Sequence, residues 1–132
     1  MMWFHIKRKP IHMTSITFHK MHGLGNDFVI FHNQDNVPLT PYFIQQIADR
    51  KTGVGCDQII VVKDASYHVN YDIDMRIFNA DGSEVGACGN ATRCVAKLID
   101  KDNLKINTYD DLLICNVNND NAVSVQLRPP FL

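Results

Sequence analysis

The amino-acid sequence predicts a single mixed domain of the α/β class, of the α+β type, in which short strands outnumber helices. Several stretches carry the alternating or continuous apolar pattern of strands, and turn residues such as glycine, asparagine and aspartate separate them. Two other stretches place apolar residues three and four positions apart, which is typical of amphipathic helices. At 132 residues, with 45% apolar and 20% charged composition, the chain is long enough to bury one core.

Composition and charge exclude several classes of function. A net charge of −1 gives no general basis for binding nucleic acid, and no apolar run approaches the roughly 18 residues of a membrane span. The four cysteines form no C-x-x-C pair, so neither a zinc site nor a disulfide framework is indicated. Free thiols fit a reducing compartment, and we therefore expect a cytoplasmic protein without a metal.

The first residues of the chain are basic, with Lys7, Arg8 and Lys9 in a row. They lack the apolar segment of a secretory signal. We expect residues 1–13 to be a disordered basic extension, with Met13 as the natural start, and residues 14–132 to form the folded domain.

The folded part is expected to begin with a strand over residues 16–20, a tight turn between Gly23 and Gly25, and a second strand over 28–32. The glycine pair does not indicate a nucleotide-binding loop, because a third glycine and a lysine are missing and a strand follows it. Asn26 is a turn former by default, yet turns are also places where polar side chains face a ligand.

A helix is predicted to begin at Thr40 and Pro41, because threonine caps helix N-termini and proline suits the first helical position. Gly53 is expected to end this helix. A continuous apolar run over 59–62 then predicts a buried strand. Cys56, in the loop before it, has no cation nearby in sequence to activate it and is interpreted as a packed side chain. The apolar stripe of the helix comprises Phe43, Ile44, Ile47 and Ala48.

The central stretch places a cysteine just before a helix. Residues 71–78 alternate as in a half-buried strand, Asp81 and Gly82 form a turn, and a helix follows. Cys88 lies in the segment G-A-C-G-N, where the N-terminus of that helix offers unpaired N–H donors and stabilises a thiolate or a substrate carboxylate. An inert buried thiol remains the alternative for Cys88. The apolar stripe of the helix comprises Ala91, Cys94, Val95, Leu98 and Ile99, so Cys94 is interpreted as a core residue.

The remaining sequence predicts three short strands, over residues 104–108, 112–117 and 122–127. The run N-N-D-N over 118–121 separates the last two and is typical of a hairpin turn.

Four motifs in order resemble the N-terminal half of the diaminopimelate epimerase family. They are K-M-H-G-L-G-N-D-F (20–28), A-D-R-x-x-G-V-G-C-D-Q (48–58), R-I-F-N-A-D-G-S-E (76–84) and A-C-G-N-x-x-R-C (87–94). The resemblance extends from about residue 18 to residue 131 but covers only about half the length of a family member. The family usually has an acidic residue where Gly86 stands and a glycine where Ala91 stands.

The resemblance implies a fold and a reaction. Family members have two pseudo-symmetric domains, each with a curved, mostly antiparallel sheet wrapped around a central helix, and they bind substrate between the domains. They interconvert LL- and meso-diaminopimelate, a step of lysine and peptidoglycan precursor biosynthesis, without pyridoxal phosphate, metal or other cofactor. One cysteine from each domain faces the α-carbon, one removing the proton and the other returning a proton to the opposite face.

The same resemblance implies roles for individual residues. Cys88 corresponds to one of the two acid/base thiols. Gly89 and Asn90 would bind the substrate through the start of the helix. Three amide side chains would also contact it, those of Asn26, Gln58 and Asn79.

Three hypotheses about function stay open from the sequence. The chain is an isomerase of the diaminopimelate epimerase type, represented by its N-terminal domain. Alternatively, it is a catalytically incomplete remnant or an assembly half that pairs with a second copy or with a separate C-terminal chain. The third hypothesis is a related isomerase or racemase with another substrate.

Overall fold

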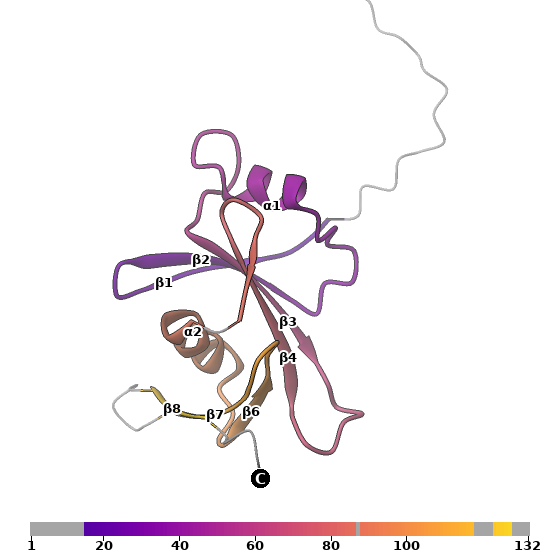
Figure 1. The fold of residues 1–132 in the computed structure, drawn as a ribbon, viewed down its shortest axis with the longest axis vertical. Coiled ribbons are helices and arrows are strands. Elements are labelled where there is room, and N and C mark those ends of the chain that lie inside the picture. Colours follow the sequence, from indigo (N-terminus) through magenta and orange to yellow (C-terminus); the bar gives the residue numbers. More distant parts are fainter. Residues whose placement is uncertain (1–14, 87, 118–122, 128–132) are drawn as a thin grey trace, which may run out of the picture.

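The strands of the chain form one sheet that curls around a helix. The computed structural model describes residues 15–86, 88–117 and 123–127. Its elements are β1 (His19–Gly23), β2 (Asn26–His32), α1 (Pro41–Ala48), β3 (Gln58–Asp64), β4 (Ile73–Asn79), β5 (Glu84–Val85), α2 (Gly89–Ile99), β6 (Leu104–Asn107), β7 (Leu112–Val117) and β8 (Val123–Leu127). The sheet has eight strands in the order β1-β2-β3-β4-β6-β7-β8, and β5 pairs with β4 outside this path. In Figure 1 the sheet wraps around α2, while α1 lies on its outer side.

Most strand pairs are antiparallel. Only β2 with β3 and β4 with β6 run parallel among the described strands, whereas β1–β2, β3–β4, β4–β5, β6–β7 and β7–β8 are antiparallel. The α+β class is therefore confirmed, and so is the curved, mostly antiparallel sheet around a central helix.

The inner face of the sheet and α2 share the larger apolar cluster. Side chains at every second position of a strand point to the same face, and those of the inner face pack against the apolar stripe of α2. Ala91, Cys94 and Val95 of the stripe are buried and Leu98 and Ile99 are partly buried, so burial on this face holds the helix in place. Fully buried members include Phe28, Ile60, Ile77, Ala91, Val95, Leu104 and Cys115.

The outer face of β2 and β3 packs against α1. The outward-facing side chains of these strands alternate with the inner-face residues and form one apolar cluster with Ile44 of α1; they are Val29, Phe31, Ile59 and Val61. Two covered faces explain why β2 and β3 are continuous apolar runs, while β4 alternates. The predicted start of α1 is confirmed, since the Thr40 hydroxyl accepts a hydrogen bond from the Phe43 N–H at 3.2 Å and Pro41 is the first helical residue.

Several element boundaries differ from the prediction. Strand β1 runs from His19 to Gly23, three residues later than expected, because its pairing with β2 extends to the Leu24–Gly25 turn. Helix α1 ends at Ala48, well before Gly53. The chain folds back there, so that Gly53 packs against the last carbonyl groups of α1, where a side chain would have no room. The two-residue strand β5 was not predicted.

Some predicted features fall on residues that the structure does not describe. The basic extension over 1–13 and the turn over 118–121 lie outside the described residues. The antiparallel pairing of β7 with β8, which that turn was expected to join, is present. In the described part of the chain, every helix is too short or too polar to cross a membrane.

Candidate functional site

Three amide side chains lie at one end of the sheet. Asn26 begins β2 and Gln58 begins β3, and these strands are parallel. Asn79 ends β4, which runs antiparallel to β3 and pairs Asn79 directly with Gln58. All three residues have the same alternation as inner-face residues such as Ile60, so they face the side of the sheet that holds α2. The structure therefore brings together the three amides that the resemblance singled out.

Hydrogen bonds fix two of these amides. Gln58 Nε2 donates to Asn79 Oδ1 at 3.0 Å, and Asn79 Nδ2 donates to Ser83 Oγ at 3.2 Å. The Ser83 hydroxyl in turn donates to Asp81 Oδ1 at 2.6 Å, inside the predicted turn. Gln58 Oε1 is buried and has no hydrogen-bond partner among the described residues. Such an oxygen has an unused capacity to accept a hydrogen bond, and leaving it unpaired costs about 1–3 kcal/mol.

The helix start at the same end of the domain carries the thiol. Cys88 is the N-cap of α2, with φ −136° and ψ 122°, and no side chain of the described residues caps this helix. Its carbonyl accepts the first helical hydrogen bond, from the Thr92 N–H at 3.0 Å. The N–H groups of the first turn are therefore available to an anion. Gly89 is exposed, with nothing within 4 Å of the place a side chain would occupy, and the Asn90 side chain accepts a hydrogen bond from Arg93 at 3.4 Å.

Strand pairing brings this helix start to the amides. Val85 pairs with Ile77, two residues before Asn79. Cys88 follows Val85 by three residues, which span at most about 11 Å. On the other side, Gly23 pairs with Asn26 and lies beside the Cys94 thiol of α2. The amides and the N-terminus of α2 thus belong to one region.

Cys88 differs from the other cysteines in its exposure. It is half-buried, whereas Cys56, Cys94 and Cys115 are at most 4% exposed. Burial raises the pKa of the Cys56 and Cys94 thiols, and it raises the pKa of Cys115 to about 11. The interpretation of Cys56 and Cys94 as packed side chains is confirmed.

The two positions that depart from the family pattern have clear surroundings. The carboxylate of Asp110 lies directly over Gly86, in the space that a side chain at 86 would occupy. An acidic group is therefore present at this place, although it comes from the turn after β6. Ala91 is fully buried in the inner cluster, so its methyl group packs into the core.

An ion-pair cluster that the sequence did not reveal lies on the outer side of the same strand ends. Arg50 donates to both carboxylate oxygens of Asp27, at 2.9 and 2.7 Å, and to Asp57 at 3.1 Å. Lys20 donates to Asp27 at 2.9 Å and also contacts the Gly55 carbonyl. We call these four side chains, Lys20, Asp27, Arg50 and Asp57, the outer ion cluster. The four residues of the outer ion cluster are far apart in sequence. The only sequence signal for the cluster is that its residues lie in two of the family motifs, those over residues 20–28 and 48–58.

The charges of the cluster reinforce one another. Hydrogen bonds from Arg50, and then from Lys20, hold the pKa of Asp27 far below its usual range. The neighbouring Asp27 raises the pKa of Arg50. Both groups are therefore ionised near neutral pH.

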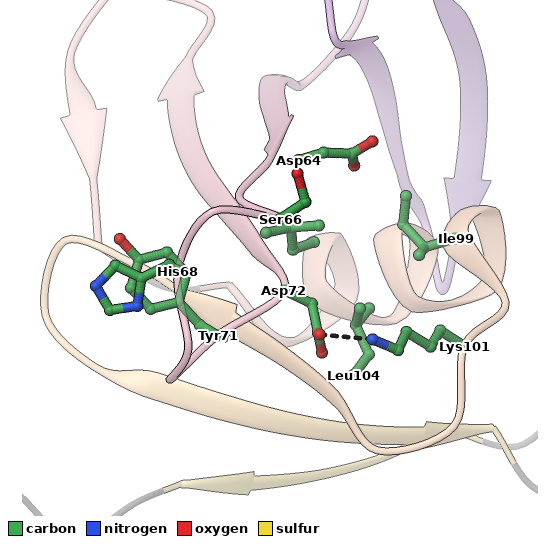
Figure 2. Close-up of a pocket in the computed structure, with 9 residues that line it drawn as sticks. Asp64, Ser66, His68, Tyr71, Asp72, Ile99, Lys101 and Leu104 are labelled. Atoms are coloured by element: carbon green, nitrogen blue, oxygen red, sulfur yellow. Dashed lines mark hydrogen bonds and ion pairs between the residues drawn. The ribbon is translucent and has the colours of Figure 1, made fainter.

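A cavity of about 440 Å³ lies at the opposite end of α2 (Figure 2). Its charged side chains are already paired, since Asp72 forms an ion pair with Lys101 and Asp64 with His32. His68 stacks on Tyr71 with ring centres 3.9 Å apart. No predicted site residue lines this cavity, so it is separate from the amides and Cys88. Within the described ranges, no three His, Cys, Asp or Glu side chains are grouped to hold a metal.

Solved structures with a similar fold include two phenazine biosynthesis proteins. A PhzF family protein from Bacillus anthracis matches with a TM-score of 0.53 and 24% identity, covering 86% of this chain and 39% of that one. A putative PhzC/PhzF protein from Clostridium difficile matches with a TM-score of 0.52 and 20% identity, over 72% of this chain and 35% of that one. At these identities the likeness concerns the fold alone.

Sequence relatives define the family. Diaminopimelate epimerases from Rhodospirillum centenum and Rhizorhabdus wittichii are 49% and 50% identical over 87% of this chain and 41% of their own lengths. The enzyme from Buchnera aphidicola is 44% identical over 92% of this chain and 46% of its own length. The chain thus spans less than half the length of these relatives. A family profile described as Diaminopimelate epimerase matches residues 18–130, and the chain therefore belongs to the diaminopimelate epimerase family.

Proposed function

We propose that this chain supplies one half of the proton-transfer site of an epimerase that interconverts LL- and meso-diaminopimelate without a cofactor. The observation that carries the proposal is the convergence of Asn26, Gln58 and Asn79 with the uncapped start of α2 on one region of the inner face. Family membership supports the same reaction.

In this proposal Cys88 is the base on one face of the α-carbon. Its thiolate takes the α-proton, and the electron pair left on carbon is delocalised into the substrate carboxylate. The N–H groups of Gly89 and Asn90 bind that carboxylate, because fixed donors at a helix start stabilise developing negative charge without reorganisation. The thiol then returns a proton to the same face, or a second acid protonates the opposite face.

The amides orient the substrate. A zwitterion presents an ammonium donor and carboxylate acceptors, and amide side chains match both without adding a competing base. The buried oxygen of Gln58 supports this role, since an N–H donor from the substrate would complete its hydrogen bonding. Asn79 lies directly opposite Gln58 on β4, and Asn26 lies on β2 two residues before Phe28, which pairs with Gln58.

A complete site needs a second thiol. Cys56, Cys94 and Cys115 are buried and cannot reach a substrate at the helix start. We propose that the second acid comes from another half, either a second copy of this chain or a C-terminal half of the kind that the longer relatives contain. Free thiols support action in a reducing compartment such as the cytoplasm.

Deuterium exchange tests the proposal. The 132-residue chain is incubated with LL-diaminopimelate, and separately with the meso form, in D₂O with a reductant, and the α-proton signal is followed by NMR. One thiol suffices to replace the α-proton by deuterium with retention, so we expect loss of the signal without formation of the other isomer. Formation of the other isomer would show that self-association completes the site.

Cys88→Ala is the control. The exchange should fall to the background rate in this variant while the amide spectrum stays that of the folded domain. A second readout is the rate at which iodoacetamide alkylates Cys88, which bound diaminopimelate should slow. Absence of both exchange and protection in the folded chain would overturn the proposal.

A further inference from the structure

We propose that Asp27 and Arg50 are positioning residues, which hold the strand ends that present Asn26 and Gln58 to the substrate. This inference rests on the proposed function, because it is the proposed function that makes Asn26 and Gln58 substrate-binding residues. The evidence is the outer ion cluster and its place in the sequence, directly beside the two amides.

Strand alternation separates the cluster from the amides. Neighbouring residues of a strand point to opposite faces, so Asp27 faces outwards where Asn26 faces inwards. Asp57 and Gln58 are related in the same way at the start of β3. The outer ion cluster therefore holds the strand backbones from the outer face of the sheet. It does not occupy the space on the inner face in which a substrate would lie.

Hydrogen bonds tie the two strand starts together in both directions. The Asp57 N–H donates to the Asp27 carbonyl at 3.0 Å and to its carboxylate at 2.9 Å. The Asp27 N–H donates to the Asp57 carboxylate at 3.0 Å. Arg50 bridges the same two carboxylates, and such charge-assisted, bidentate pairs are stronger and more directional than neutral hydrogen bonds. The relative position of the starts of β2 and β3 is thus fixed by side chains as well as by the sheet.

The loop that carries Arg50 is built to reach this point. Gly55 has φ +81°, and a side chain there would lie 3.1 Å from the Arg50 Cα. The Gly55 N–H donates to the Ile47 carbonyl at 2.9 Å, which docks the loop on the end of α1. Lys20 contacts the Gly55 carbonyl and brings β1 into the same cluster.

Arg50→Met tests the inference, with Lys101→Met as its matched control. Both replacements remove a cation that pairs with an aspartate, and the two side chains are similarly exposed, at 57% and 55%. Lys101 lies at the opposite end of the domain. In Arg50→Met we expect the Asp57 amide proton to exchange about tenfold faster, and the side-chain NMR signals of Asn26 and Gln58 to move towards those of an unstructured chain. Lys101→Met should leave both unchanged.

Substrate protection supplies a second readout. The diaminopimelate concentration that halves the alkylation rate of Cys88 should rise about tenfold in Arg50→Met and stay constant in Lys101→Met. In Arg50→Lys it should return part of the way to the value of the unaltered chain, because lysine keeps the positive charge but cannot form the two parallel hydrogen bonds of a guanidinium. Unchanged Asn26 and Gln58 signals in Arg50→Met, or equal changes in Lys101→Met, would overturn the positioning role. Absence of protection in the unaltered chain would instead count against the proposed function, while the substrate-free spectra still decide the positioning role.

Discussion

Replacing Gly82 by alanine should destabilise the domain through two separable effects. Gly82 has φ +92°, a conformation that an L side chain rarely adopts, and an added Cβ would lie 2.7 Å from the Pro41 Cα. Unstrained carbon contacts are about 3.5–4.0 Å. The substitution therefore forces either the turn after Asn79 or the first residue of α1 to move.

The size of the effect follows from these two terms. Backbone strain at positive φ costs about 1–2 kcal/mol, and overpacking against a backbone that cannot yield costs about 1–3 kcal/mol more. We expect Gly82→Ala to lower the free energy of unfolding by about 2–5 kcal/mol, measured by urea unfolding followed by circular dichroism.

Gly25→Ala separates the two terms. Gly25 has nearly the same φ, +89°, but nothing lies within 4 Å of an added Cβ. It should lose only the strain term, about 1–2 kcal/mol. Equal losses in the two variants would refute the argument that Pro41 obstructs the space over Gly82.

Three further substitutions or treatments probe other parts of the structure. In the folded protein iodoacetamide should label Cys88 first, because Cys56, Cys94 and Cys115 are nearly inaccessible. Peptide mass spectrometry after partial reaction measures the labelling of each cysteine, and equal labelling of all four would contradict this expectation. Thr40→Ala should cost about 1 kcal/mol of unfolding free energy through loss of the α1 cap, whereas an unchanged urea midpoint would contradict the cap. Because its ion pairs depress the pKa of Asp27, the stabilisation they give is present above the unfolded pKa of about 3.9 and is lost as the pH falls below it. Unfolding curves should therefore show Asp27→Asn well below the unaltered chain at pH 7 and approaching it towards about pH 2, and a gap that stays constant would count against this account.

The sequence was sufficient for features that depend on local patterns. The apolar stripe of α2, from Ala91 to Ile99, and the cap of α1 at Thr40 are both readable from a few neighbouring residues. The alternating run before Asn79 likewise predicted a strand of the right extent to within two residues. Cys88 was placed at the start of a helix by the same means.

Features that depend on tertiary contacts were not readable. Gly53 looks like a helix stop, but α1 ends five residues earlier because the following loop packs back on its carbonyl groups. Arg50 meets Asp27 across 23 residues of sequence, and only the parallel pairing of β2 with β3 brings them together. The place of Asp110 over Gly86 is of the same kind. Predicting that Asn26, Gln58 and Asn79 lie near one another required either the order of the strands in the sheet or knowledge of the family.

The position of α2 between the two edges of the sheet bears on how the chain acquires its structure during synthesis. Helix α2 lies beside β1, the first strand of the sheet path, and beside β8, the last. During synthesis β1 to β5 and α2 leave the ribosome well before residues 123–127. Part of the inner face therefore stays exposed to solvent until β8 has been synthesised. Many contacts are long-range, which favours slow, cooperative closure over early local folding. Helix α2 should therefore be among the last parts to become rigid, and a nascent chain halted before β8 should expose apolar side chains of the inner face to chaperones.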